Sequence, residues 1–346
     1  MFSKLIGNLP VKQTLKRLVI SGRIPNAMLL AGPEGVGKRL FAIEIARAML
    51  CPQQKDGEGC GVCTSCVRIG TFSLPTSDTA DDYKMVFFSE NPDVGMVVPF
   101  KRNIAVDAIR DLEREAHFSP FEAKARFFII DDAHKMNPAA ANALLKTLEE
   151  PAETSHIFLI SSRPDSFLPT IRSRCQMLRF GPAARSEIEE YLIDSLAFSH
   201  DEARLAAAVS HGSVANAVAV DVEKYRMRSQ RMLDVVRNAL VVHDLTALLR
   251  VSDELNDAKN KDDLEANLDI LEFLLHDIWI LDKTRDTERI SNREYAAELT
   301  SIAASASAGT IQNWLASIAE MRKNFVVNVN RKAALDAMLA KAGFDG

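Results

Sequence analysis

The chain has 346 residues, of which 47% are hydrophobic and 26% are charged, and its formal net charge is -5 at pH 7. This composition excludes a largely disordered chain, and the length suggests two or three domains, of which we expect three. The sequence shows no charged-then-apolar signal segment and no apolar run of about 18 residues, so we expect a cytoplasmic protein that contacts no membrane. The net negative charge gives no general attraction to nucleic acid, so contact with DNA would need a local basic face or partner subunits.

The N-terminal part predicts a helix, a strand, a glycine-rich loop and a second helix. Apolar residues recur at helical spacing between Leu9 and Arg23, with lysines and arginines between them. The short apolar run Ala27–Gly32 is typical of a buried strand. Helical periodicity resumes after Lys38.

Three further apolar runs predict strands at Arg126–Asp131, His156–Ser162 and Cys175–Phe180. Helical stretches such as Asn137–Glu150 separate them. Strands that alternate with helices predict an α/β fold with a mostly parallel sheet covered on both faces, which binds ligands at the carboxyl ends of its strands. Residues 72–99 show no clear periodicity and predict only a long loop with one strand.

After Pro182 the sequence becomes almost entirely helical in pattern. We therefore predict an α/β domain over residues 1–181, a small helical domain over 182–225 and a larger helical domain over 226–346. The segment Asp269–Leu281 is apolar on all sides, so it must pack inside its domain or against a neighbouring chain.

The segment Gly32–Arg39 reads GPEGVGKR and fits the phosphate-binding pattern G-x-x-x-x-G-K. In such a loop the glycines let backbone N–H groups surround phosphates, and the lysine reaches the outer ones. The alternative is a glycine-rich turn with a surface lysine. The predicted nucleotide-binding residues are Gly32, Pro33, Gly35, Val36, Gly37, Lys38, Arg39, Asp131 and Asp132.

Arg39 and Asp132 oppose ATP hydrolysis by this site. Arg39 stands where a magnesium-binding Ser or Thr is expected, and a guanidinium only donates hydrogen bonds. Asp131, at the end of a predicted strand, suits a magnesium site, but the next position carries Asp132 in place of the glutamate that positions water. Either acid could instead cap the strand end. We therefore expect negligible ATP hydrolysis by the isolated chain. The sequence permits the binding of ATP and Mg²⁺ but does not favour it.

Four of the five cysteines lie close together, at Cys51, Cys60, Cys63 and Cys66. Clustered thiolates in a reducing compartment favour one structural Zn²⁺ held by all four. An iron–sulfur cluster is the competing interpretation, but the ferredoxin spacing would place its fourth cysteine at position 70, which is Gly70. Four unliganded thiols are the remaining alternative.

Arg174 lies in the segment Leu168–Cys175, which the pattern places on a loop before the last strand. From spacing alone it is either a solvated surface arginine or a group that stabilises phosphate charge on a neighbouring subunit.

Together these motifs resemble the AAA+ clamp-loader family of bacterial DNA polymerase III. The resemblance is carried by the glycine loop, by the four-cysteine module directly after the first helix that follows this loop, and by the segments Ile129–Pro151, Leu168–Cys175 and Asn328–Leu339. It implies an AAA+ domain with an inserted zinc module, a helical lid, and a helical collar that assembles a ring of five subunits. Deleting the chain after about residue 225 should then abolish ring assembly.

The resemblance also separates two types of subunit. The gamma/tau motor normally has a hydroxyl residue after the loop lysine, a glutamate after the strand-end aspartate, and an arginine in the lid pattern GSxR. This chain has Arg39, Asp132 and Ala215 at those places, which favours a non-hydrolysing component of the polymerase holoenzyme over a gamma/tau-like motor.

By the same resemblance Arg174 acts in trans on an adjacent ATP site. The implied partners are gamma/tau and delta subunits, with the sliding clamp and primer–template DNA contacted through the complex, at the nucleoid-associated replisome. Two rivals remain, namely a self-sufficient ATPase, which Arg39, Asp132 and Ala215 oppose, and a zinc-stabilised DNA-binding module, which the net charge opposes.

Overall fold

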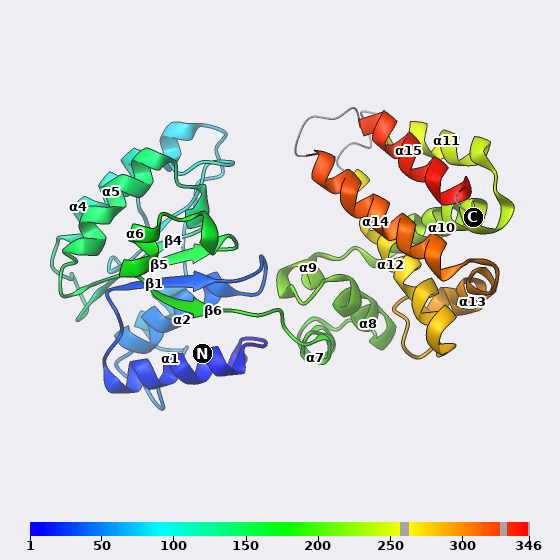
Figure 1. The fold of residues 1–346 in the computed structure, drawn as a ribbon. Coiled ribbons are helices and arrows are strands. Elements are labelled where there is room, and N and C mark those ends of the chain that lie inside the picture. The colour runs from blue at the N-terminus through cyan, green and yellow to red at the C-terminus, as the bar shows by residue number, and fades with distance from the viewer. Residues whose placement is uncertain (257–262, 326–330, 345–346) are drawn as a thin grey trace. The chain divides into compact units, whose positions relative to one another are not determined.

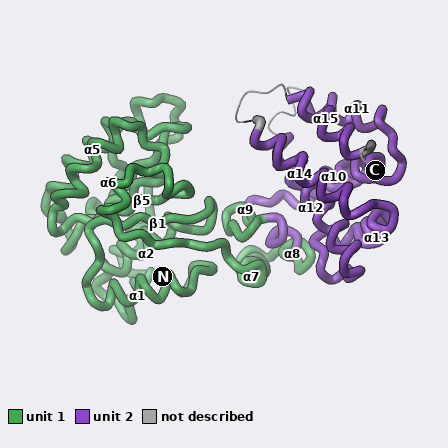
Figure 2. The backbone as a smooth tube through the Cα atoms, viewed as in Figure 1, with its two compact units in different colours: residues 1–203, 210–218 green, residues 204–209, 219–346 purple. Residues whose placement is uncertain are grey.

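The computed structural model describes residues 1–256, 263–325 and 331–344, which form two compact units (Figures 1 and 2). The first unit contains Met1–Ala203 and Ser210–Val218, and the second contains Arg204–Val209 and Ala219–Gly346. The units divide the predicted lid between them, and the three-domain division stays a prediction.

The first unit is built on a six-stranded sheet with the order β2-β3-β4-β5-β1-β6. Every neighbouring pair is parallel except β2 and β3, which are antiparallel. The strands are β1 (Ala27–Ala31), β2 (Phe87–Phe88), β3 (Val94–Val97), β4 (Arg126–Ile130), β5 (Ser155–Ser161) and β6 (Gln176–Arg179). The mostly parallel α/β sheet predicted from the sequence is confirmed, and its four predicted strands are present to within one residue at either end.

Helices cover both faces of this sheet (Figure 1). The helices of the first unit are α1 (Leu9–Ser21), α2 (Lys38–Leu50), α3 (Thr64–Ile69), α4 (Val106–Ala116), α5 (Pro138–Glu149), α6 (Pro169–Arg174), α7 (Arg185–Leu196) and α9 (Val214–Ala219), and α8 (His200–Val209) begins in it.

Alternate residues of the strands face opposite layers, as the period of a strand requires. Met28 and Phe158 pack in one core with residues of α1 and α2. Leu29 and Leu159 pack in the other core with residues of α4, α5 and α6. Because both faces are buried, these strands appear in the sequence as continuous apolar runs.

Two expectations for the first unit were wrong in detail. Residues 72–99 contribute two strands, β2 and β3, where one was expected. Arg174 ends a short helix, α6, and does not lie on a loop. Pro169 stands at the start of α6, a position that suits proline because the first helical N–H has no intrahelical partner.

The second unit is helical among the residues that the structure describes. Its helices are the later part of α8, then α10 (Val222–Arg237) followed by a π-helical turn (Asn238–Val242), α11 (Leu245–Leu255), α12 (Leu264–Thr284), α13 (Ala296–Ser305), α14 (Ala308–Phe325) and α15 (Arg331–Phe344). Residues 328–330, which begin the last family-like segment, lie outside the described residues.

The apolar segment Asp269–Leu281 forms most of α12 and packs inside the second unit. Its buried residues include Ile270, Leu271, Leu274, Leu275, Ile278 and Leu281. The same helix contacts α10, α13 and α14. Of the two fates predicted for this segment, burial within its own unit is therefore the one observed.

Candidate nucleotide pocket and metal centre

The glycine loop connects β1 to α2 at the carboxyl edge of the sheet, and its glycines are required by close contacts and by backbone angles. A Cβ on Gly32 would lie 2.4 Å from the carbonyl oxygen of Phe180. Gly35 and Gly37 have φ angles of +71° and +90°, which L residues other than glycine rarely adopt. A Cβ on Gly35 would also lie 2.0 Å from Ser213 Oγ.

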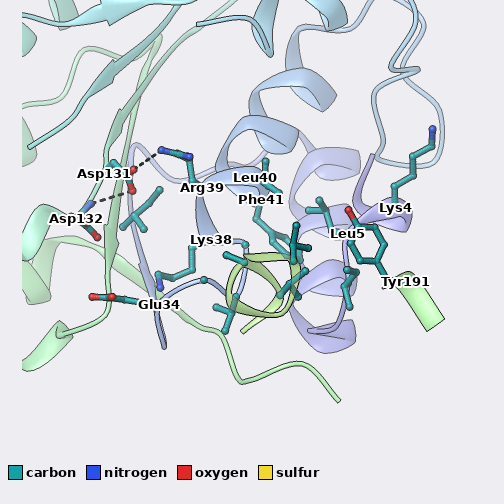
Figure 3. Close-up of a pocket in the computed structure, with 18 residues that line it drawn as sticks. Lys4, Leu5, Glu34, Lys38, Arg39, Leu40, Phe41, Asp131, Asp132 and Tyr191 are labelled. Carbon is teal, nitrogen blue, oxygen red and sulfur yellow. Dashed lines mark hydrogen bonds and ion pairs between the residues drawn. The ribbon is translucent and has the colours of Figure 1, made fainter. Parts of the chain in front are cut away.

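This loop forms one wall of a cavity of about 650 Å³ (Figure 3). Seven of the predicted nucleotide-binding residues line it, namely Gly35, Val36, Gly37, Lys38, Arg39, Asp131 and Asp132. Gly32 and Pro33 are not part of the lining, but their carbonyl groups accept hydrogen bonds from the Lys38 ammonium, at 2.7 Å for Gly32. The structure thus gathers residues that lie far apart in the sequence around one cavity.

Lys38, the loop lysine, is buried, with 6% of its surface exposed. Burial lowers the pKa of its ammonium group, while the charges of Asp132, Glu34 and Asp131 oppose that shift. Its hydrogen-bond acceptors are neutral carbonyl groups, so the buried charge faces the pocket without a directly bonded carboxylate among the contacts described here.

Arg39 and Asp131 form an ion pair beside Lys38, with 3.1 Å between Arg39 Nη1 and Asp131 Oδ2 (Figure 3). The Asp131 side chain is 18% exposed, and the Arg39 side chain is 51% exposed. Burial raises the pKa of Asp131, the charge of Asp132 raises it further, and Arg39 opposes both effects. The acid at the end of β4 is thus already bound by a cation from the protein.

Asp132 follows with a φ angle of 46°, a left-handed conformation. Its backbone N–H donates to Asp131 Oδ1 at 3.2 Å, and its carboxylate binds Lys135 Nζ at 2.8 Å. The carboxylate that stands in the place of a water-positioning glutamate is therefore held by a lysine of its own turn.

The opposite end of the pocket is mostly apolar, apart from Lys4, and was not predicted from the sequence. Its residues come from the segment before α1 and from α7 and α9: Leu5, Ile6, Tyr191, Val214 and Val218. Ala215, predicted as a departure in the lid, also lines the pocket, and its N–H donates to the Gly35 carbonyl at 3.1 Å. No local pattern marks these side chains as a group, because tertiary packing alone brings them to the loop.

The four clustered cysteines meet in space. Their sulfur atoms all lie within 4.8 Å of one another. The Cys51 and Cys63 sulfurs are 3.9 Å apart, and those of Cys60 and Cys66 are 4.0 Å apart. A tetrahedral zinc site with Zn–S bonds of about 2.3 Å places its sulfurs roughly 3.8 Å apart. The cluster therefore fits a metal ion without rearrangement of its backbone.

Local structure holds these sulfurs in place. Cys51 follows the last residue of α2, and Cys63 is the residue that caps the N-terminus of α3. Backbone N–H groups of Cys60, Cys63 and Cys66 donate to the sulfurs of Cys51, Cys60 and Cys63 respectively. Hydrogen bonds from Val62 and Cys63 lower the pKa of Cys60 to about 6, which favours its thiolate form.

Arg174 lies at the end of α6, and the described residues that line the pocket do not include it. Its Nη1 donates to the Thr170 carbonyl at 3.0 Å, and its Nη2 lies 2.7 Å from Glu149 Oε1. The side chain is 34% exposed. Arg172, two residues earlier, instead binds Asp165 at 3.1 Å.

The parallel sheet, the glycine loop between β1 and α2 and the acid at the end of β4 define a P-loop domain of the AAA+ type. Residues 7–184 match the family described as "DNA polymerase III, delta subunit". The chain belongs to this family.

Individual relatives separate the subunit types. The chain is 26% identical to the delta' subunit of DNA polymerase III from Bacillus subtilis over 332 residues, which cover 95% of this chain and 94% of the relative. For the delta' subunit of Escherichia coli the identity is 25%, with coverage of 96% and 93%. The gamma/tau subunit of Mycobacterium bovis is 33% identical over 173 residues, and the match spans only 50% of this chain and 27% of that relative. The near full-length similarity supports the delta-prime type of subunit.

One further finding concerns membranes. Among the described residues, no helix is both long and apolar enough to cross one.

Proposed function

We propose that this protein is the delta-prime, non-motor subunit of a replicative clamp loader, which helps to load the sliding clamp onto primed DNA. Similarity to delta' subunits along almost the whole chain supports this proposal. The proposed partners are gamma/tau motor subunits and a delta subunit, with the clamp and primer–template DNA reached through the assembled complex. The proposed place of action is the cytoplasm, at the nucleoid-associated replisome.

The observation that carries the non-motor assignment is the ion pair between Arg39 and Asp131. In hydrolysing P-loop proteins a Ser or Thr hydroxyl and an acidic residue at these positions hold magnesium. Here the first position is Arg39, whose guanidinium cannot coordinate a metal ion. Arg39 instead forms an ion pair with Asp131 at the second position. The pocket fits a nucleoside phosphate at its loop and its apolar end, but its acidic residue does not fit a magnesium ion.

Arg174 is proposed to act on the ATP site of an adjacent motor subunit. Its partial exposure, its hydrogen bond to the Thr170 carbonyl and its ion pair with the Glu149 carboxylate support this role. These two contacts limit the conformations of a long side chain, which lowers the entropy lost when it binds phosphate oxygens. A guanidinium supplied in this way stabilises charge on the transferring phosphoryl group.

The four-cysteine cluster is proposed to hold one structural Zn²⁺. The sulfur separations, and the fact that the cluster consists only of cysteines among the residues that the structure describes, support a closed site of the structural kind. When bound, zinc would link the end of α2 to the start of α3 and hold the insertion together.

Two assays test the proposed function. The isolated chain should hydrolyse ATP negligibly, and turnover near that of a motor subunit that is lost in Lys38→Ala would instead favour a gamma/tau-like motor. A complex reconstituted with Arg174→Ala should assemble normally yet lose DNA-stimulated ATPase partially and clamp loading by about tenfold or more, since one arginine finger is worth roughly 10³–10⁵ in rate at its own site.

Arg172→Ala is the matched control for the arginine test and should leave clamp loading close to normal. Arg174→Lys should rescue poorly, because lysine keeps the charge but not the planar fork of donors. Normal assembly, normal melting and undiminished clamp loading by Arg174→Ala would show that the residue does not act in trans.

A further inference from the structure

The two side chains at the metal positions of the pocket bind each other. Arg39 lies on the first turn of α2, directly after the loop lysine, and Asp131 directly follows β4. Figure 3 shows the Arg39 guanidinium directed at the Asp131 carboxylate, and the two groups are 3.1 Å apart. A cation thus already stands at the place where other P-loop sites recruit one from solution.

This arrangement disfavours a divalent ion for two physical reasons. A guanidinium presents only donors, so Arg39 cannot serve as a metal ligand. A metal ion on Asp131 would also stand within a few ångströms of a fixed like charge, where Coulomb repulsion is strong in a half-buried site.

We propose that the pocket binds a nucleoside di- or triphosphate without a divalent metal ion, and that Arg39 supplies the positive charge which a metal ion supplies in hydrolysing relatives. This inference rests on the nucleotide-binding part of the proposed function. It changes the ligand from a metal–nucleotide complex to the free nucleotide, and it gives Arg39 a binding role of its own.

The shape of the cavity supports a nucleoside phosphate as the ligand. One end carries Lys38 and Arg39, the first two residues of α2, together with the carboxylates of Glu34, Asp131 and Asp132. The other end is mostly apolar, apart from Lys4, and the lining of the pocket includes the aromatic rings of Tyr191 and Phe41. A charged end and an apolar end within about 650 Å³ suit a molecule with phosphates on one side and a base on the other.

Lys38 provides the second cation for such a ligand. Its ammonium group is buried and donates to the carbonyls of Gly32 and Pro33. A phosphate oxygen is a stronger acceptor for an ammonium donor than a neutral carbonyl. We therefore expect a phosphate group to draw Lys38 away from the loop carbonyls, while Arg39 stays on Asp131 and offers its remaining donors.

The test is calorimetric titration of the full chain with ADP, once in EDTA and once in excess Mg²⁺. Binding in EDTA should be at least as tight as binding in Mg²⁺, and we expect it to be severalfold tighter because Mg²⁺ competes with Arg39 for the phosphates. Adenosine and pyrophosphate, titrated separately in EDTA, should each bind at least tenfold more weakly than ADP.

Arg39→Ser returns a hydroxyl to the metal position and should reverse the metal dependence. Its affinity for ADP in EDTA should fall by tenfold or more, and Mg²⁺ should restore part of the loss. Arg110→Ser is the matched control, since Arg110 is an exposed arginine of the same unit that pairs with Asp107 on α4. Circular dichroism and thermal melting of both variants would establish that they fold.

Several results would overturn the inference. These are a strict requirement of the unmodified chain for Mg²⁺, equal binding by Arg39→Ser in EDTA, binding of pyrophosphate as tight as that of ADP, or no heat of binding at millimolar ADP. None of these results bears on the Arg174 test in the assembled complex, so a failure here is distinguishable from a failure of the clamp-loader assignment.

Discussion

The four-cysteine cluster and the candidate nucleotide pocket lie in the same compact unit, and each gathers side chains that bind cations in other proteins. In the cluster, four sulfurs stand at the separations of a tetrahedral metal site. In the pocket, the acidic residue Asp131 is paired with Arg39, a cation of the protein itself. The first site could hold a metal ion, and we propose that the second excludes one.

This difference follows from the electrostatic free energy of each group of side chains when no cation is bound to it. Four thiolates close together repel one another, so a metal ion is the natural compensation. Asp131 is a partly buried carboxylate, and an arginine from the adjoining helix supplies a positive charge 3.1 Å away. A phosphate-binding loop can therefore be retained while its metal chemistry is removed by one residue.

The largest effect should come from breaking the cysteine cluster. The unmodified protein should contain close to one zinc per chain, and Cys63→Ser should lose it. We expect a loss of about 3 kcal/mol or more in the free energy of unfolding, roughly 6–12 °C in melting temperature, because a structural metal contributes its binding energy to folding. Elemental analysis and thermal melting measure both quantities.

Cys175→Ser is the control for that experiment. Cys175 is buried away from the cluster, so its replacement should lower stability through packing while the zinc content stays the same. Iron in place of zinc, or a metal-free protein purified without chelators, would contradict the assignment.

A middle-sized effect should separate two glycines of the loop. Both Gly35 and Gly37 have positive φ angles, so alanine at either position should cost about 1–2 kcal/mol of backbone strain. A Cβ on Gly35 would in addition collide with Ser213 Oγ, whereas a Cβ on Gly37 would meet no heavy atom within 4 Å. Gly35→Ala should therefore melt at a lower temperature than Gly37→Ala.

The reason for the difference is the contact between the loop and α9. Ser213 Oγ accepts a hydrogen bond from the N–H of Asn216 at the start of α9, and that bond would have to break. Equal melting temperatures for the two variants would mean that α9 moves away from the loop at little cost.

The two sites also differ in how far they could be predicted from the sequence. The four clustered cysteines lie within the short stretch from Cys51 to Cys66, and their spacing alone indicates a shared centre. The side of the pocket formed by the glycine loop is likewise indicated by a local motif. The apolar side of the pocket is not, because Leu5 and Tyr191 reach the pocket only through packing between distant segments.

Two further features needed the structure. The charges of Arg39 and Asp131 are evident in the sequence, but their contact depends on the way α2 and β4 meet at the edge of the sheet. The strands β2 and β3 are short, and β3 is buried along its whole length, so neither shows the alternation by which a half-buried strand is recognised. The zinc and Arg174 assignments remain predictions for the experiments above.

The smallest effect concerns the pH dependence of stability at the pocket. Burial raises the folded-state pKa of Asp131 above its ordinary value of about 3.9, and Arg39 holds that rise in check. For an acid with a raised folded-state pKa, the folded state binds the proton more tightly, so stability is gained as pH falls through that pKa and is lost as pH rises through it.

Arg39→Ala removes the opposing cation and should raise the pKa of Asp131 further. The variant should be less stable than the unmodified chain by about 1 kcal/mol or less at pH 7, since the ion pair is half exposed. This deficit should be smaller at an acidic pH than at pH 7, because protonation of Asp131 removes the uncompensated charge. Urea unfolding at both pH values measures it, and the double variant Arg39→Ala with Asp131→Asn should show no such change with pH. A deficit of the same size at both pH values would mean that Arg39 contributes through packing of its side chain and that its charge on Asp131 is without effect on stability.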